Sequence, residues 1–151
     1  MRASGPERLT VAGKLELPQV VCPGGSEHLG ILVDVANQVP AGWKDHQVVW
    51  HSPHVFVPRL NAEQQDRVAA EIGKRLAHTS GNCTFLMPLK GVSAYSAEGG
   101  ELFNPELDAA YWSSLQRHLP PTVEIQSLNL TAEDPLFVEH AVETLVAMME
   151  G

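Results

Sequence analysis

The chain has 151 residues, 44% of them hydrophobic, which suffices for one hydrophobic core, so we expect a single domain over residues 1–151. Its 10 Lys and Arg residues against 18 Asp and Glu residues give a formal net charge of −8 without a basic run, which argues against nucleic acid as a partner. The apolar stretches are far shorter than the roughly 20 residues that cross a bilayer, and residues 1–14 lack the apolar centre of a signal peptide, so we expect a cytoplasmic protein with no membrane partner.

The first third of the chain predicts a helix, then a strand that ends in a glycine turn. A helical pattern over Pro6–Glu16 ends at Leu17-Pro18, and the β-branched run through Cys22 predicts a strand. Cys22 and Cys83 both lie in apolar runs, which indicates reduced core residues; a disulfide between neighbouring strands is the alternative. Residues 26–44 are only weakly periodic, so the pattern does not decide between a short helix and a loop for this segment.

The rest of the chain alternates strand and helix signals. Strands are predicted at 47–50, 55–57, 82–89 and 122–128. Helices are predicted after capping residues, from Asn61 to Ser80-Gly81, from Asn104-Pro105 to Pro120-Pro121, and from Asp134-Pro135 through Met149. This alternation predicts an α/β fold with a mainly parallel sheet covered by helices on both faces.

Ligands of parallel sheets bind outside the carboxyl ends of the strands. Four loops follow predicted strands directly, so we expect them to converge at one edge of the sheet: 23–30, 51–54, 88–100 and 129–134. In the first loop, Gly24-Gly25-Ser26 allows backbone N–H groups to approach an anion. A tight turn that needs positive φ would use the same glycines, and neither a Walker loop nor a G-x-G-x-x-G spacing is present.

A second anion-binding candidate follows the strand at 82–89. Lys90-Gly91-Val92-Ser93 offers an ammonium, a turn glycine and a hydroxyl to a phosphate or a carboxylate. The alternative is a solvated lysine beside a turn glycine.

Histidines gather near the two early predicted loops and raise the question of a metal site. They are His28, His46, His51 and His54. His51-x-x-His54 contains Pro53, so the pair does not lie on one helical face as in H-E-x-x-H, and we expect no metal site. The serines of these loops also lack the G-x-S-x-G context of a hydrolase nucleophile.

Several short blocks resemble one known family over nearly the whole chain from about Arg8 onward. The most specific part is Leu86–Pro105, in which Pro88-Leu89-Lys90-Gly91-Val92-Ser93-Ala94 is followed by Phe103-Asn104-Pro105-Glu106. The other blocks are Pro18-Gln19-Val20-Val21 before Gly24-Gly25, His51-Ser52-Pro53 before Arg59, and Asp134-Pro135. In order and spacing the chain resembles the C-terminal half of uncharacterised protein family 0261, the ATP-binding family related to the tomato mosaic virus resistance protein.

This resemblance implies a longer two-domain protein in which each half is a Rossmann-like three-layer unit. ATP binding, with Mg²⁺ as its companion, is attributed to the family as a whole and not to this half alone, and dimerisation is common. The function expected is a ligand-binding and oligomerising domain of a nucleotide-binding protein. Its partners would be a small anionic ligand or nucleotide, the N-terminal half of the same protein and further copies of itself.

Two other functions stay open. One is a catalytic half-site acting on a small anionic metabolite, with Glu27 and His51 as acid–base candidates and a pocket that the N-terminal half completes. The other is a protein-interaction domain whose ligand site is vestigial.

Overall fold

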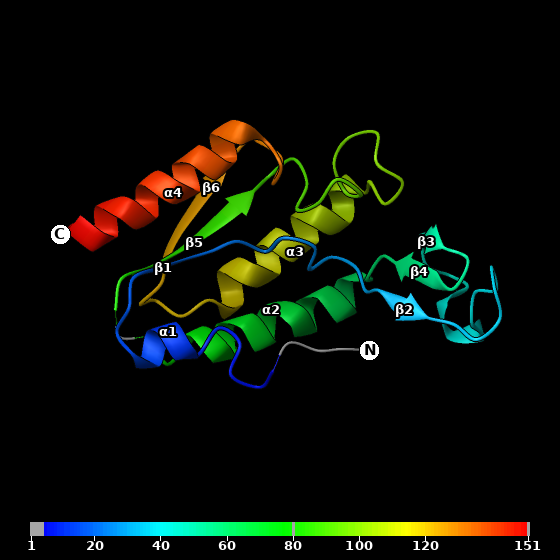
Figure 1. Ribbon diagram of the computed structural model, residues 1–151, viewed down its shortest axis with the longest axis horizontal. Helices are drawn as coiled ribbons and strands as arrows, with labels where there is room; N and C mark the ends of the chain where they lie inside the picture. The colour runs from blue at the N-terminus through cyan, green and yellow to red at the C-terminus, as the bar shows by residue number, and fades with distance from the viewer. Residues whose placement is uncertain (1–4, 80, 151) are drawn as a thin grey trace.

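The computed structural model describes residues 5–79 and 81–150 (Figure 1). The helices are α1 (Val11–Lys14), the 3-10 helix η1 (Ala41–Trp43), α2 (Ala62–Leu76), α3 (Pro105–His118) and α4 (Pro135–Glu150). The strands are β1 (Gln19–Val21), β2 (Ile31–Leu32), β3 (Val48–Ser52), β4 (Val55–Pro58), β5 (Cys83–Pro88) and β6 (Glu124–Leu128). The chain thus has a mixed α/β fold.

One sheet is parallel and has three strands in the order β1-β5-β6. Gln19 pairs with Cys83 on one side of the central strand, and Thr84 pairs with Glu124 on the other. All six residues of β5 are buried, as expected for a strand with helices on both of its faces. In Figure 1, α2 and α3 lie on one side of this sheet and α4 lies on the other.

The remaining strands form a separate antiparallel sheet in the order β2-β4-β3, so the expectation of a mainly parallel sheet is wrong for half of the strands. The segments at 47–50 and 55–57 do form strands, but only Pro53 and His54 separate β3 from β4. So short a connection permits antiparallel pairing alone, because a parallel pair needs a crossover of a dozen or more residues. This sheet lies at the end of the molecule away from the C-terminus (Figure 1).

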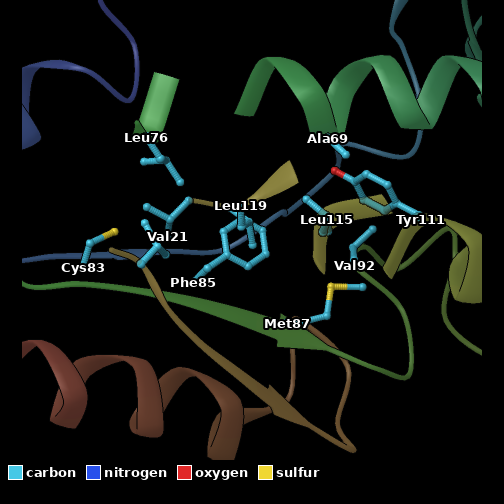
Figure 2. Close-up of a cluster of buried hydrophobic side chains, with 11 residues drawn as sticks. Val21, Ala69, Leu76, Cys83, Phe85, Met87, Val92, Tyr111, Leu115 and Leu119 are labelled. Carbon is cyan, nitrogen blue, oxygen red and sulfur yellow. The ribbon is translucent and has the colours of Figure 1, made fainter. Parts of the chain in front are cut away.

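The core fills the space between the parallel sheet and the helices α2 and α3 (Figure 2). Phe85 from β5 and Leu115 from α3 are completely buried there, next to Leu76 of α2. The two helices approach each other closely at Gly73, where a Cβ atom would lie 2.1 Å from the carbonyl oxygen of His118. The core therefore fixes both helices against one face of the sheet.

Capping residues set the helix starts. Asn61 forms a capping box with Gln64 at the start of α2, and Asn104 accepts a hydrogen bond from the amide of Leu107 at the start of α3. The helix end expected at Ser80-Gly81 is wrong, because α2 ends at Leu76; Ser80 itself lies outside the described residues.

Two expectations for the start of the chain are wrong. The helix expected over 6–16 is only α1, because Leu9 and Glu16 adopt positive φ angles of 65° and 57° that no helix continues through. Cys22 is exposed beyond the end of β1, whereas Cys83 is buried as expected, and both thiols are free.

Helix α4 differs from α2 and α3 in how little of it is buried. Phe137 is its one buried residue among those described, and Leu136, Val138, Val142, Val146 and Met149 are exposed. The described residues contain no helix that is both long and apolar enough to cross a membrane.

Candidate functional site

Three loops meet at the carboxyl end of the parallel sheet. The amide of Gly25, after β1, donates to the carbonyl of Val92, after β5, at 3.0 Å. The amide of Lys90 donates to Leu130 at 3.0 Å, and that of Ala132 donates to Gly91 at 2.9 Å, which joins the loop after β6. The predicted residues around Gly24 and Gly91 therefore lie at the same end of the sheet.

The fourth expected loop, 51–54, does not follow a parallel strand, because it is the turn of the β3–β4 hairpin and His51 is part of β3. It still reaches this region, since His51 Nδ1 lies 3.3 Å from the hydroxyl of Tyr95. His28 contacts the same ring edge to face, with ring centroids 5.6 Å apart. Tyr95 thus connects the hairpin to the loop after β1.

Each of the four histidines has a different hydrogen-bond partner, although His28 and His51 both contact Tyr95. His46 Nδ1 lies 2.6 Å from the carbonyl of Arg59, and His54 Nδ1 lies 3.0 Å from that of Val33. Within residues 5–79 and 81–150, no three His, Cys, Asp or Glu side chains come together in a group that could hold a metal ion.

Glu27 is completely buried where the loops after β1 and β5 meet. Its Oε1 accepts a hydrogen bond from Ser93 Oγ and lies 3.0 Å from His28 Nδ1. Burial alone would raise the pKa of Glu27, but the hydrogen bonds from His28 and Ser93 outweigh it, so the pKa lies below the usual 4.5. Its Oε2 is buried and has no hydrogen-bond partner among the described residues. Glu27 is therefore an ionised, incompletely paired carboxylate inside the protein.

Arg59 is a second buried charge, which the sequence indicated only as part of a family block and not as a site residue. Its side chain is 1% exposed and donates to Asp108 Oδ1 at 2.7 Å and to the carbonyl of Leu102. Burial raises the pKa of Asp108, the pairing with Arg59 opposes that rise, and the charge of Glu27 adds to it. These contacts tie the end of the antiparallel sheet to the start of α3.

The buried Glu27 and the half-buried Asp108 predict opposite effects on acid stability. The lowered pKa of Glu27 stabilises the fold above 4.5, and that contribution is lost as the pH falls through the folded pKa. The raised pKa of Asp108 destabilises the fold as the pH rises from 3.8 through the folded pKa. In urea unfolding from neutral pH into acid, Glu27→Gln should therefore make the loss of stability shallower and Asp108→Asn should make it steeper. Parallel curves for both variants would contradict these pKa directions.

The serine hydroxyls of the two anion-binding candidates are engaged within the protein. Ser26 Oγ donates to the carbonyl of Pro23 at 2.6 Å, so the hydroxyl of Tyr111, 2.7 Å away, donates to Ser26. Burial raises the pKa of Tyr111 to about 12, which keeps that hydroxyl protonated. Ser93 Oγ donates to Glu27. An anion would have to displace one of these bonds to use either serine.

Some backbone amides of the predicted site are engaged as well. The Gly25 amide donates to Val92, and the Ser93 amide donates to Ser96 Oγ at 3.2 Å. Gly91 has a conformational reason of its own, because its φ is 126° and a Cβ atom would lie 2.7 Å from the backbone of Ala97. The turn geometry therefore accounts for Gly91 without a ligand.

Two cavities of similar size flank this edge. The first, of about 470 Å³, lies between the ends of β5 and β6 and the first half of α3, and Lys90, Glu98, Phe103, Trp112 and Thr131 line it. The second, of about 480 Å³, lies between β1 and α2, and its lining includes Gly24 and Ser26. The structure therefore places Lys90 and the first glycine turn on different cavities rather than on one.

Comparison with known proteins confirms the family part of the resemblance, the C-terminal half of protein family 0261. Residues 1–149 match the model of the "Uncharacterised protein family (UPF0261) C-terminal domain". A UPF0261 protein of Clostridium tetani is 30% identical over 97% of this chain and 36% of its own length. UPF0261 proteins of Mesorhizobium japonicum and Rhizobium meliloti are 34% and 30% identical, over 68% and 90% of this chain and 26% and 34% of their own lengths. The chain spans about a third of the length of the curated relatives it matches. It belongs to the UPF0261 family, as a C-terminal domain of that family.

Proposed function

We propose that this domain is the ligand-binding and oligomerising part of a larger nucleotide-binding protein, and that ATP or a related small anionic metabolite binds in the cavity lined by Lys90. In this proposal the parallel sheet with helices on both faces is a Rossmann-like three-layer unit. The proposal rests on one observation, which is that a cavity of about 470 Å³ with a lysine on its wall lies just outside the carboxyl ends of β5 and β6. Ligands of open α/β sheets bind at that position.

The lining of this cavity fits the parts of a nucleotide. Phe103 and Trp112 offer aromatic surface to a planar base, and the exposed Lys90 offers a point charge to phosphate oxygens. Glu98, an exposed carboxylate on the same wall, would face the Mg²⁺ that accompanies ATP. The remainder of the protein, N-terminal to this domain in the relatives, would complete the pocket, since ligand sites occur preferentially between domains.

Replacing Lys90 with methionine should weaken the binding of ATP–Mg by about 1–3 kcal/mol, the range for a charge-assisted hydrogen bond. Methionine keeps much of the aliphatic stem, and Lys90 is exposed, so the thermal unfolding midpoint should stay nearly constant. The measurement is a calorimetric titration of the intact protein with ATP–Mg, ADP and small carboxylates.

The matched control for this experiment is Lys44→Met, which removes an exposed lysine outside the cavity. It should leave the affinity unchanged. Equal affinities for Lys90→Met and the parent protein would assign Lys90 to the solvated surface, and a flat titration for every ligand would favour a protein-interaction domain.

The oligomerising role rests on the exposed face of α4. Val138, Val142 and Val146 recur at intervals of four residues, so they form one stripe along the helix. In a dimer with two-fold symmetry, the commonest symmetry of oligomers, the α4 helix of a second copy would cover this stripe.

Light scattering should therefore give a mass above that of one chain, and Val142→Glu should return the protein to a monomer while the core stays intact. The charged side chain would be buried without a partner in such an interface. Glu143→Gln, on the same helix and outside the stripe, is the control. A parent protein that stays monomeric at high concentration would contradict the proposal.

A second candidate function is a catalytic half-site for a small anionic metabolite, supported by the hydroxyl of Ser93 that donates to the ionised Glu27. In this candidate, His51 would contact the hydroxyl of Tyr95 and would not contact Glu27 directly. Turnover that is lost in both Glu27→Gln and Ser93→Ala while ligand binding persists would favour this candidate.

A further inference from the structure

The cavity between β1 and α2 has a chemistry of its own. Its volume is about 480 Å³, within the range of small-molecule sites, and it shares no lining residue with the cavity of Lys90. The segment Arg8-Leu9 forms one wall, α2 forms another, and the residues that follow β1 form a third.

The inner lining of this cavity is apolar. Val21 and Phe85 from the sheet, Val68 and Ile72 from α2, and Leu9 supply aliphatic and aromatic surface. Val21 and Phe85 also belong to the core drawn in Figure 2, so the cavity extends from the core toward the surface. A ligand here would place an apolar body against the half-buried Leu9, Val68 and Ile72.

The rim of the cavity is basic, in contrast to the net charge of −8 of the whole chain. Arg8, Arg67 and Arg75 are three of the 10 basic residues of the chain, and all three line it. They face Glu71 on the rim and the neighbouring Glu63, so the rim keeps one net positive charge. That balance suits a single negative charge better than a polyphosphate.

The three arginines are not equally held. Arg75 donates to Glu71 at 2.7 Å and to the carbonyls of Pro6 and Arg8 at 2.9 and 3.0 Å, so it fixes the segment that closes the cavity. Among residues 5–79 and 81–150, Arg67 pairs only with Glu63, and both side chains are at least 70% exposed. An exposed ion pair of this kind contributes little to the stability of the fold, and its side chains exchange partners easily. The guanidinium of Arg67 can therefore turn to a ligand. Its planar fork matches the geometry of a carboxylate.

We propose that this cavity binds a small monocarboxylate with an apolar body, whose hydrocarbon part packs against Leu9, Val68 and Ile72 while Arg67 and Arg8 pair with the carboxylate. The proposal does not depend on nucleotide binding, because the two cavities are lined by different residues. It extends the anion-binding expectation for Gly24 and Ser26 to a site where the charge comes from arginines rather than from turn amides.

Titration of the intact protein with octanoate, octanamide and inorganic phosphate tests the proposal. Octanoate should bind, and octanamide, which has the same chain without the charge, should bind about tenfold more weakly. Phosphate alone should not compete, because it lacks the apolar body. Amide shifts in an NMR titration should centre on Leu9 and Val68.

The variants Arg67→Met and Arg8→Met should each weaken octanoate binding about tenfold, while Lys74→Met, an exposed position on α2 outside the cavity, should not change it. Lys90→Met should also leave octanoate binding unchanged, which separates this site from the nucleotide site. Equal binding of octanoate and octanamide, or amide shifts confined to the Lys90 cavity, would overturn the proposal, as would an absence of octanoate binding.

Discussion

Replacing Arg59 with methionine is expected to lower the free energy of unfolding by about 3–5 kcal/mol at neutral pH, the range for breaking a buried ion pair. Arg59 is 1% exposed, and its guanidinium serves Asp108 at 2.7 Å and the carbonyl of Leu102. Methionine keeps much of the volume but leaves both acceptors without their donor. Urea unfolding followed by tryptophan fluorescence measures the loss.

Arg67→Met is the matched control for Arg59→Met, since it breaks an exposed pair with Glu63 that is worth about 0–1 kcal/mol. Burial already raises the pKa of Asp108, and the loss of Arg59 would raise it further, so the penalty of Arg59→Met should shrink as the pH falls. Equal losses for the two arginine variants would show that Arg59 is not a buried partner of Asp108.

Replacing Gly91 with alanine is expected to destabilise the fold by about 2–5 kcal/mol, because two separate costs combine. The φ of 126° strains any residue with a Cβ atom, and that atom would lie 2.7 Å from the Cα and the amide nitrogen of Ala97. Backbone atoms on both sides must then move. Thermal and urea unfolding of the variant measure the combined cost.

Gly99→Ala separates the two contributions to the Gly91 effect. Gly99 has a φ of 84°, yet a Cβ atom there would meet no atom within 4 Å, so its replacement costs backbone strain alone, about 1–3 kcal/mol. The excess for Gly91→Ala measures crowding against Ala97. Equal losses of stability in the two variants would show that a Cβ atom at position 91 does not crowd the backbone of Ala97.

Local chemistry made much of the fold predictable from the sequence. Helices α2 and α3 begin directly after Asn61 and Asn104, because a capping side chain acts on amides within the same turn. β5 was predictable as a buried strand because the run from Phe85 to Leu89 is continuously apolar. The convergence of the loops around Gly24 and Gly91 followed from the parallel direction of their strands.

Features that depend on contacts between distant parts of the chain could not be predicted from the sequence. The division into two sheets depends on which strands pair, and alternation of strand and helix signals does not encode that for the hairpin at 48–58. The burial and pairing of Arg59 were not predictable, because Leu102 and Asp108, which receive its hydrogen bonds, lie more than 40 residues away. The division of Lys90 and Ser26 between two cavities depends on side-chain direction, which order along the chain does not determine.

The position of the antiparallel sheet in the chain also affects the order in which the domain folds. All of β2, β3 and β4 lies between β1 and β5, so pairing Gln19 with Cys83 closes a longer stretch of chain than pairing Thr84 with Glu124. Loop closure costs more entropy for the longer stretch, and parallel pairing already folds slowly for this reason. This difference favours the β5–α3–β6 unit over the β1–β5 pair as the first part of the sheet to form. We therefore expect the glycine turn after β1, with the arginine-rimmed cavity beside it, to be completed after β5 and β6 have paired.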